Sequence, residues 1–205
     1  MTADDAIRTV RERGILMQEA VPAGVGGMSA VLGMTADEIN AVVDEIPNVQ
    51  VANYNCPGQI VISGLKEAVE IAAVKLKEAG ARRVIPLNVS GPFHSYLLEE
   101  AGEKLGRFLE NIPVSEPVIP YVANVTAAYV TKAEDVKPLL TRQVSSSVRW
   151  QQSVEAMIAD GVDTFIEIGP GKTLAGFMRK ISRDVKTLNV EKLEDISKVA
   201  EALKS

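Results

Sequence analysis

The stretch that decides the fold is GGMSAVLGMTADEINAVVDEIPNVQVANYNCPGQIVISGLKEAVEIAAVKLKEAGARRVIPL, residues 26–87. Apolar residues alternate as in strands at 27–32, 49–53, 60–63 and 83–87, and recur with helical spacing between the first and second strands and between the third and fourth. This is the βαββαβ order of a ferredoxin-like unit. The sequence therefore predicts a small ferredoxin-like subdomain over residues 26–87.

Both helices of this stretch carry recognisable end signals. Thr35 and Glu38 are spaced as a capping box at the start of the first helix. The second helix is expected to end at Gly80. Between the middle strands, residues 53–59 are rich in turn-forming residues, so Cys56 is expected in a turn.

The rest of the chain predicts a larger α/β part made of residues 1–25 and 88–205. An amphipathic helix opens the sequence, with Thr2 as its N-cap. Pro138 is expected to end the stretch that follows Thr131 and to lie in the first turn of a new helix. Alternation of strands and helices favours a parallel sheet. Further helices are predicted near residues 97–112, 139–145, 151–161, 174–182 and 193–203, and strands near 119–124, 164–168 and 185–190.

Composition excludes several classes of function. The 205 residues include 22 basic and 27 acidic side chains, which give a net charge of -5, and no basic cluster suggests nucleic-acid binding. One Cys and one His support neither an internal disulfide nor a His-rich metal site. The first residues lack the features of a signal peptide, and no uncharged run is suited to spanning a membrane. We expect a cytoplasmic protein without a bound metal.

The segment VSGPFHS, residues 89–95, holds the single histidine, His94. If Ser95 caps the helix that follows, the positive end of that helix would disfavour protonation of His94 and keep it available as a general base. The alternative is a surface histidine in a loop. A base also needs a nucleophile, and no Gly-x-Ser-x-Gly string occurs in the sequence.

A second glycine-rich segment, GPGKT at residues 169–173, ends like a phosphate-binding loop. Ile166 stands where the first glycine of that motif belongs, so the spacing favours an ordinary turn between a strand and a helix.

Several strings in order resemble the malonyl-CoA:acyl-carrier-protein transacylase family. Individually each is weak, but their common order and spacing are specific. They are RGILMQ at 13–18, NYNCPGQIVISG at 53–64, PFHS at 92–95, NVTA at 124–127, Gln143 with VRW at 148–150, and EIGPGK at 167–172.

This resemblance implies an α/β-hydrolase-like large subdomain with the ferredoxin-like subdomain inserted in it. It implies S-malonyltransferase activity in fatty-acid synthesis, with malonyl-CoA and acyl carrier protein as partners and no cofactor beyond the coenzyme A thioester. His94 would activate a serine, the backbone carbonyl of Gln143 would orient the imidazole, Arg13 would bind the malonyl carboxylate, and Phe93 would crowd substituents on the malonyl α-carbon. Without the resemblance, the alternative interpretation of Arg13 is a solvent-exposed charge on a helix, and that of Phe93 is a side chain packed in the core.

The resemblance also implies parts that these 205 residues do not contain: the elbow serine, an oxyanion-hole glutamine and the first strands of the large sheet. We expect these parts to lie before Met1. The chain would then be a truncated gene product, an expressed fragment, or one half of a split enzyme whose other half is a second chain. The large subdomain would then be incomplete and the chain alone inactive. The alternative from another class is a non-catalytic module that binds acyl carrier protein.

Overall fold

The computed structural model describes residues 1–204. By their internal contacts these residues form two compact units, Met1–Ser153 and a second that begins at Val154. The boundary falls within helix α6 (Trp150–Ala159).

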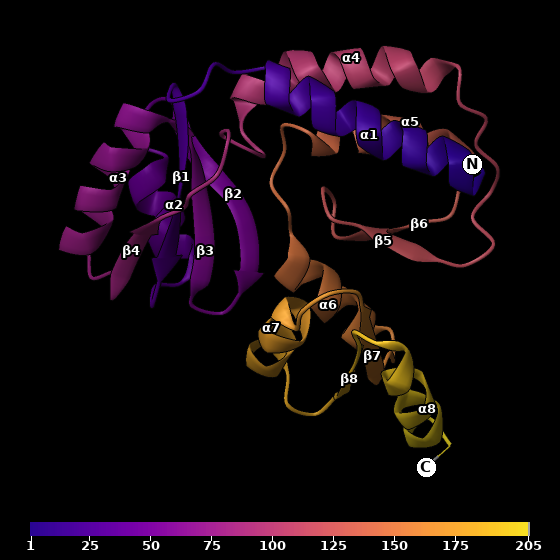
Figure 1. Ribbon diagram of the computed structural model, residues 1–205. Coiled ribbons are helices and arrows are strands. Elements are labelled where there is room, and N and C mark those ends of the chain that lie inside the picture. Colours follow the sequence, from indigo (N-terminus) through magenta and orange to yellow (C-terminus); the bar gives the residue numbers. More distant parts are fainter. Residues whose placement is uncertain (205) are drawn as a thin grey trace. The chain divides into compact units, whose positions relative to one another are not determined.

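A four-stranded sheet forms one part of the first unit (Figure 1). Its strand order is β2-β3-β1-β4, and every neighbouring pair is antiparallel. The sequence order β1-α2-β2-β3-α3-β4 is the predicted one. The elements are β1 (Gly26–Leu32), α2 (Ala36–Val43), β2 (Val49–Cys56), β3 (Gln59–Leu65), α3 (Lys66–Glu78) and β4 (Arg83–Pro86).

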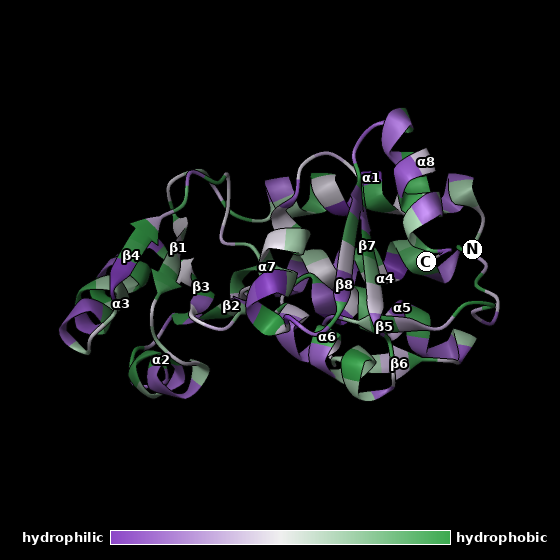
Figure 2. Cartoon of the chain, turned by 90° about the horizontal axis from the view of Figure 1, so that it is seen from below, coloured by the Kyte–Doolittle hydropathy of each residue, from purple (hydrophilic) through white to green (hydrophobic). Residues whose placement is uncertain are grey.

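Helices α2 and α3 share a buried core with one face of this sheet. Figure 2 shows both helices with hydrophobic and hydrophilic residues, as expected of amphipathic helices. The capping box at the start of α2 is confirmed: the Glu38 amide donates to Thr35 Oγ1 at 3.3 Å, and the Thr35 amide donates to Glu38 Oε2 at 2.8 Å. The core contains residues from both helices and all four strands, among them Val31, Ile39, Ile62, Leu76 and Val84.

The opposite face of the sheet carries a smaller buried cluster of Met28, Ala52 and Val61. Leu87 and Phe93, from the chain that follows β4, pack against this cluster. That chain leads directly to His94, so this face of the sheet supports the candidate site.

Three helices pack together in the rest of the first unit: α1 (Ala3–Glu19), α4 (Glu99–Glu110) and α5 (Ala133–Gln143). Met17, Leu105 and Val144 belong to their common core. Helix α4 approaches α5 closely at a glycine, because a Cβ on Gly102 would lie 3.0 Å from the carbonyl oxygen of Thr141.

The prediction for Pro138 is wrong, because α5 begins five residues earlier and runs through it. A proline inside a helix removes one backbone hydrogen bond and costs about 3 kcal/mol. Helix α5 nevertheless continues through Pro138, and it packs closely on α4, a contact that the local sequence does not show.

The expected strand at 119–124 is shorter than predicted. Strand β5 (Tyr121–Ala123) pairs antiparallel with β6 (Ala128–Val130), a partner that the sequence analysis did not anticipate. The parallel arrangement expected of the larger part therefore does not hold here. Ile119 lies outside the strand and is 79% exposed.

The second unit contains one parallel strand pair. Strands β7 (Thr164–Ile168) and β8 (Lys186–Val190) pair in parallel, as predicted, with α7 (Thr173–Ile181) between them in sequence and α8 (Leu193–Ala202) after them. The Glu167 carboxylate accepts hydrogen bonds from the amides of Leu174 at 3.1 Å and Ala175 at 2.8 Å. A carboxylate thus occupies the start of α7, where a nucleotide phosphate would bind, so the geometry favours the ordinary turn.

Among residues 1–204, no helix combines the length and the apolar character needed to cross a membrane.

Candidate active site

The loop that carries His94 is fixed on both sides by packing and hydrogen bonds. Pro92 is buried against Gly26, where an added Cβ would lie only 2.4 Å from the proline ring. The Ser95 hydroxyl donates to the Pro92 carbonyl at 2.7 Å and forms no capping hydrogen bond with the following helix. The prediction that Ser95 caps this helix is therefore wrong. That helix begins as a 3-10 turn, η1 (Tyr96–Leu98).

His94 has a backbone φ of 57°, in the left-handed region that non-glycine residues rarely adopt. Such conformations cost of order 1–3 kcal/mol and persist only where surrounding contacts impose them. They concentrate at functional sites. The backbone of His94 is therefore held in a conformation that its own sequence does not favour.

The imidazole of His94 lies against the end of α5. Its Nδ1 is 3.0 Å from the backbone carbonyl oxygen of Gln143. Because a carbonyl oxygen only accepts, Nδ1 must carry the proton in this contact, and Nε2 keeps its lone pair. An imidazole fixed in this tautomer can accept a proton at Nε2.

The surroundings of His94 favour its neutral form. Burial lowers the pKa of His94 below its ordinary value, and the positive charge of Arg13 lowers it further. Hydrogen bonds with the backbone at Gln143 and Ser146 act in the opposite direction. The direction matches the sequence analysis, but the causes are burial and Arg13, whereas we had expected the dipole of the following helix.

A cavity of about 430 Å³ opens in front of the imidazole. Its lining brings together three of the four predicted site residues, Arg13, Phe93 and His94. Gln143, the fourth, contacts His94 from behind. The other lining residues are Gly14, Met17, Gln18, Met28, Asn53, Leu87 and Val89.

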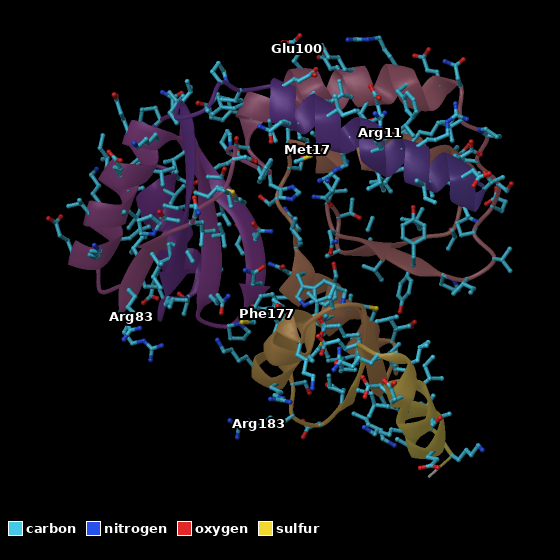
Figure 3. All side chains as sticks on the ribbon, in the orientation of Figure 1. Arg11, Met17, Arg83, Glu100, Phe177 and Arg183 are labelled. Atoms are coloured by element: carbon cyan, nitrogen blue, oxygen red, sulfur yellow. The ribbon has the colours of Figure 1, made fainter. Side chains whose placement is uncertain are left out.

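Arg13 contributes an unpaired positive charge to this cavity. It is half-buried on α1, one turn before Met17, which Figure 3 labels. Among the described residues no carboxylate forms an ion pair with it. Burial lowers the pKa of Arg13, but a guanidinium stays charged at any physiological pH. The cavity is therefore suited to an anionic group.

Gln143 is held in place by the segment that follows it. Its side-chain amide donates to the carbonyls of Ser146 at 3.1 Å and Ser147 at 3.4 Å. This segment joins the edge of β2, where the Val148 amide donates to the Ala52 carbonyl at 2.8 Å and the Tyr54 amide donates to the Val148 carbonyl at 2.9 Å. The contact between Gln143 and His94 thus rests on the four-stranded sheet.

No nucleophile lines the described cavity, since its residues include no Ser, Thr or Cys. Cys56 is not in a turn as predicted; it is the last residue of β2 and fully buried. No group of three or more His, Cys, Asp or Glu side chains within residues 1–204 could hold a metal ion.

A larger hollow of about 720 Å³ lies between the start of α1 and the segment around Pro113–Tyr121. Its lining, as far as residues 1–204 form it, is mainly apolar and contains no His, Arg, Lys or Cys. We place the candidate site in the smaller cavity, because that is where the oriented imidazole and the unpaired cation meet.

Sequence reasoning missed Gln50, whose side chain contacts the His94 loop. The sequence signal that could have indicated Gln50 was a polar residue between two valines of a predicted strand, Val49 and Val51. In the structure both valines are buried.

Comparison with known proteins places this arrangement in a family. The acyl transferase domain matches residues 1–199. The chain belongs to the acyl transferase family.

Individual relatives in this family are similar over most of the chain. A malonyl CoA-acyl carrier protein transacylase of Bacillus subtilis is 48% identical over 204 residues, covering 98% of this chain and 64% of the relative. A crystal structure of a malonyl CoA-acyl carrier protein transacylase from Clostridium perfringens superposes with a TM-score of 0.95 and 42% identity, covering 100% of this chain and 65% of that one.

A third similar structure shows a malonyl-transacylase in complex with its type II PKS acyl-carrier protein. It superposes with a TM-score of 0.93 and 39% identity, covering 97% of this chain and 65% of that one. The chain therefore spans slightly less than two thirds of the length of these relatives, 64% or 65%.

Proposed function

We propose that this chain supplies the base and the carboxylate-binding group of a malonyl-CoA:acyl-carrier-protein S-malonyltransferase of fatty-acid synthesis. The observation that carries the proposal is the cavity shared by Arg13 and His94. The similarity to transacylases of that name supports it.

In the proposed reaction His94 acts twice as a proton carrier. Its Nε2 takes the proton of a serine hydroxyl as the serine oxygen attacks the thioester carbonyl, and the coenzyme A thiolate leaves with that proton. The carrier-protein thiol then gives its proton to Nε2, and its sulfur attacks the carbonyl carbon of the serine ester. The ester bond to the serine oxygen breaks, and that oxygen takes the proton from Nε2 as the malonyl thioester of the carrier protein leaves. The serine is not among these 205 residues. The Gln143 carbonyl holds the tautomer in place of a triad carboxylate.

Arg13 and Phe93 are proposed to select the acyl group. A guanidinium offers two parallel hydrogen bonds to the free carboxylate of a malonyl group. Phe93 lines the cavity beside His94 and would restrict larger substituents on the malonyl α-carbon.

The fold assignments of the sequence analysis remain proposals at their finer level. The strand order β2-β3-β1-β4 and the two helices on one face support a ferredoxin-like subdomain over residues 26–87. We assign residues 1–25 and 88–205 to part of an α/β-hydrolase-like large subdomain.

We further propose malonyl-CoA and acyl carrier protein as partners, a cytoplasmic location, and no cofactor beyond the coenzyme A thioester. A missing segment or second chain would supply the serine. The transacylase that is bound to its acyl-carrier protein supports the choice of protein partner.

Binding of free malonate to the chain tests the anion site without requiring turnover. Malonate should bind, and Arg13→Ala should weaken binding by about 10-fold or more, since a charge-assisted pair contributes about 1.5–3 kcal/mol. Arg11→Ala is the matched control, because Arg11 lies on the same helix but is exposed (Figure 3). Equal effects of the two substitutions would contradict the assignment of Arg13.

Transfer itself needs the portion of fold that the chain does not cover in its relatives. Co-expression with, or fusion to, the uncovered portion of the Bacillus subtilis relative should give malonyl transfer to acyl carrier protein. His94→Ala in that assembly should lower the rate by about 100-fold or more, the scale of a lost general base. Carrier-protein binding without transfer in a correctly folded assembly would favour the non-catalytic module.

A further inference from the structure

Gln50 on β2 projects from the face of the sheet that carries the His94 loop. Its neighbours Val49 and Val51 are buried in the core with α2 and α3. Successive side chains of a strand point to opposite faces, which directs Gln50 away from that core. The side chain is half-buried.

The amide group of Gln50 makes three hydrogen bonds, all to backbone atoms near the candidate site. Its Nε2 donates to the carbonyl of His94 at 3.2 Å and to the carbonyl of Ser145 at 3.4 Å. Its Oε1 accepts from the amide of Tyr96 at 3.0 Å. The group's two donor hydrogens and its acceptor are thus all engaged.

These bonds join two segments that are distant in sequence and that together form the His94–Gln143 contact. His94 lies 44 residues from Gln50, and Ser145, two residues after Gln143, lies 95 residues away. The bonded atoms of His94 and Tyr96 flank Ser95, so Gln50 fixes the backbone just after the left-handed residue. A single side chain therefore constrains both partners of the imidazole contact.

We propose that Gln50 is a positioning residue that holds His94 in its left-handed conformation and keeps its Nδ1 against the Gln143 carbonyl. The importance of this for catalysis rests on the proposed function, but the geometric claim does not. Glutamine fits the task because it can donate to two carbonyls and accept from an amide at the same time. Neither glutamate nor an apolar side chain offers that combination.

The single histidine makes a direct test possible, because every imidazole signal of the chain comes from His94. Nitrogen-15 NMR of the full chain reports both the tautomer and the titration of that ring. The unsubstituted chain should show the Nδ1–H tautomer. The charge that acts on this ring is that of Arg13, which lines the same cavity.

Two substitutions remove the clamp in different ways. Gln50→Met keeps the approximate volume and loses all three hydrogen bonds, whereas Gln50→Glu keeps the acceptor for Tyr96 and loses the donor. Both should reduce the share of the Nδ1–H tautomer and shift the titration of His94, because the contact with the Gln143 carbonyl and the burial of the ring both act on its pKa. In an assembly active in transfer, both should lower kcat by about 10- to 100-fold with little change in KM.

Tyr54→Phe is the matched control, because it removes one side-chain hydrogen bond of the same strand, from Tyr54 to Asn40 at 3.0 Å, without touching the His94 loop. It should leave the imidazole signals unchanged. An unchanged tautomer and an unchanged titration of His94 in folded Gln50→Met and Gln50→Glu would overturn the proposal. Loss of folding in both variants would also overturn it, because Gln50 would then be a general structural residue. A failure to detect malonyl transfer in any assembly would refute the proposed function and leave the NMR result standing.

Discussion

The contact between Gly26 and Pro92 gives a sharp prediction for the loop that carries His94. In Gly26→Ala the new Cβ would lie 2.4, 2.5 and 2.6 Å from three carbons of the Pro92 ring. Carbon atoms pack at about 3.5–4.0 Å, so the loop or the strand must move by roughly 1 Å. A proline ring has no alternative rotamer that could relieve the overlap.

Overpacking of this kind costs about 1–3 kcal/mol. Against it stands the gain of about 0.4–1 kcal/mol from a less flexible unfolded chain. We expect a net loss of about 1–2 kcal/mol in the free energy of opening of the four-stranded sheet. Amide hydrogen exchange in β1 and β3 measures that quantity for this part of the molecule alone.

Gly27→Ala on the same strand is the matched control. Its Cβ would lie 3.5 Å from the Lys66 Cα, an ordinary contact, so this variant should be as stable as the parent or slightly more stable. In Gly26→Ala the imidazole signal of His94 should also change, because Pro92 is two residues away. If the two alanine variants had equal opening free energies and the same His94 signal, the packing of Pro92 on β1 would not be what fixes the loop.

Two further predictions concern stability. Because the pKa of His94 is lowered in the folded chain, the unfolded chain binds more protons below pH 7. The free energy of unfolding should therefore fall as the pH is lowered through the ordinary histidine pKa of about 6.5, and it should level off below the folded pKa. Urea titrations between pH 5.5 and 7.5 measure this slope, and His94→Gln should lack it. A slope that persists in His94→Gln would have another source. Gly102→Ala should lower the free energy of unfolding by about 1–2 kcal/mol, because its Cβ would lie 3.0 Å from the Thr141 carbonyl oxygen. Gly14→Ala, with no atom within 4 Å of the added Cβ, should raise it by about 0.5–1 kcal/mol, and equal shifts would contradict the close packing of α4 on α5.

Local patterns sufficed where each element carried its own signals. The order of strands and helices between Gly26 and Pro86 follows from alternation, helical periodicity and the Thr35–Glu38 capping box. The parallel pair β7–β8 was predicted from the alternation of strand and helix. In these segments the local preferences and the final packing agree.

The errors occur where distant contacts decide. The helix through Pro138 runs against the local preference of proline, and the three-residue strands β5 and β6 are too short for periodicity to reveal them. The hydroxyl of Ser95 binds the Pro92 carbonyl because the loop folds back on itself. None of these outcomes is encoded in the propensities of the residues concerned.

The candidate site divides in the same way. His94 stands out as the one histidine, in a loop before a helix. Its partner Gln143 lies 49 residues away, and only the family resemblance indicated that pairing. Gln50 was not recognised at all, because its role depends on which two loops meet above β2.

The last prediction is that these 205 residues alone form no covalent malonyl adduct. Acyl transfer through an ester needs an oxygen or sulfur nucleophile beside the base, and none of the described residues that line the cavity in front of His94 is a Ser, Thr or Cys. Cys56 cannot substitute, since its fully buried side chain lies outside that lining. Loss of a nucleophile alone lowers such rates by several orders of magnitude.

Intact mass spectrometry after incubation with labelled malonyl-CoA decides the question. We expect the mass of the unmodified chain, while a control that includes the uncovered portion of the Bacillus subtilis relative should gain one malonyl group. His94→Ala in that control should abolish the gain on the same time scale, because no base then activates the serine that forms the adduct. A malonyl group found on the isolated chain, and passed on to acyl carrier protein, would show that the described cavity is not where the acyl group is carried.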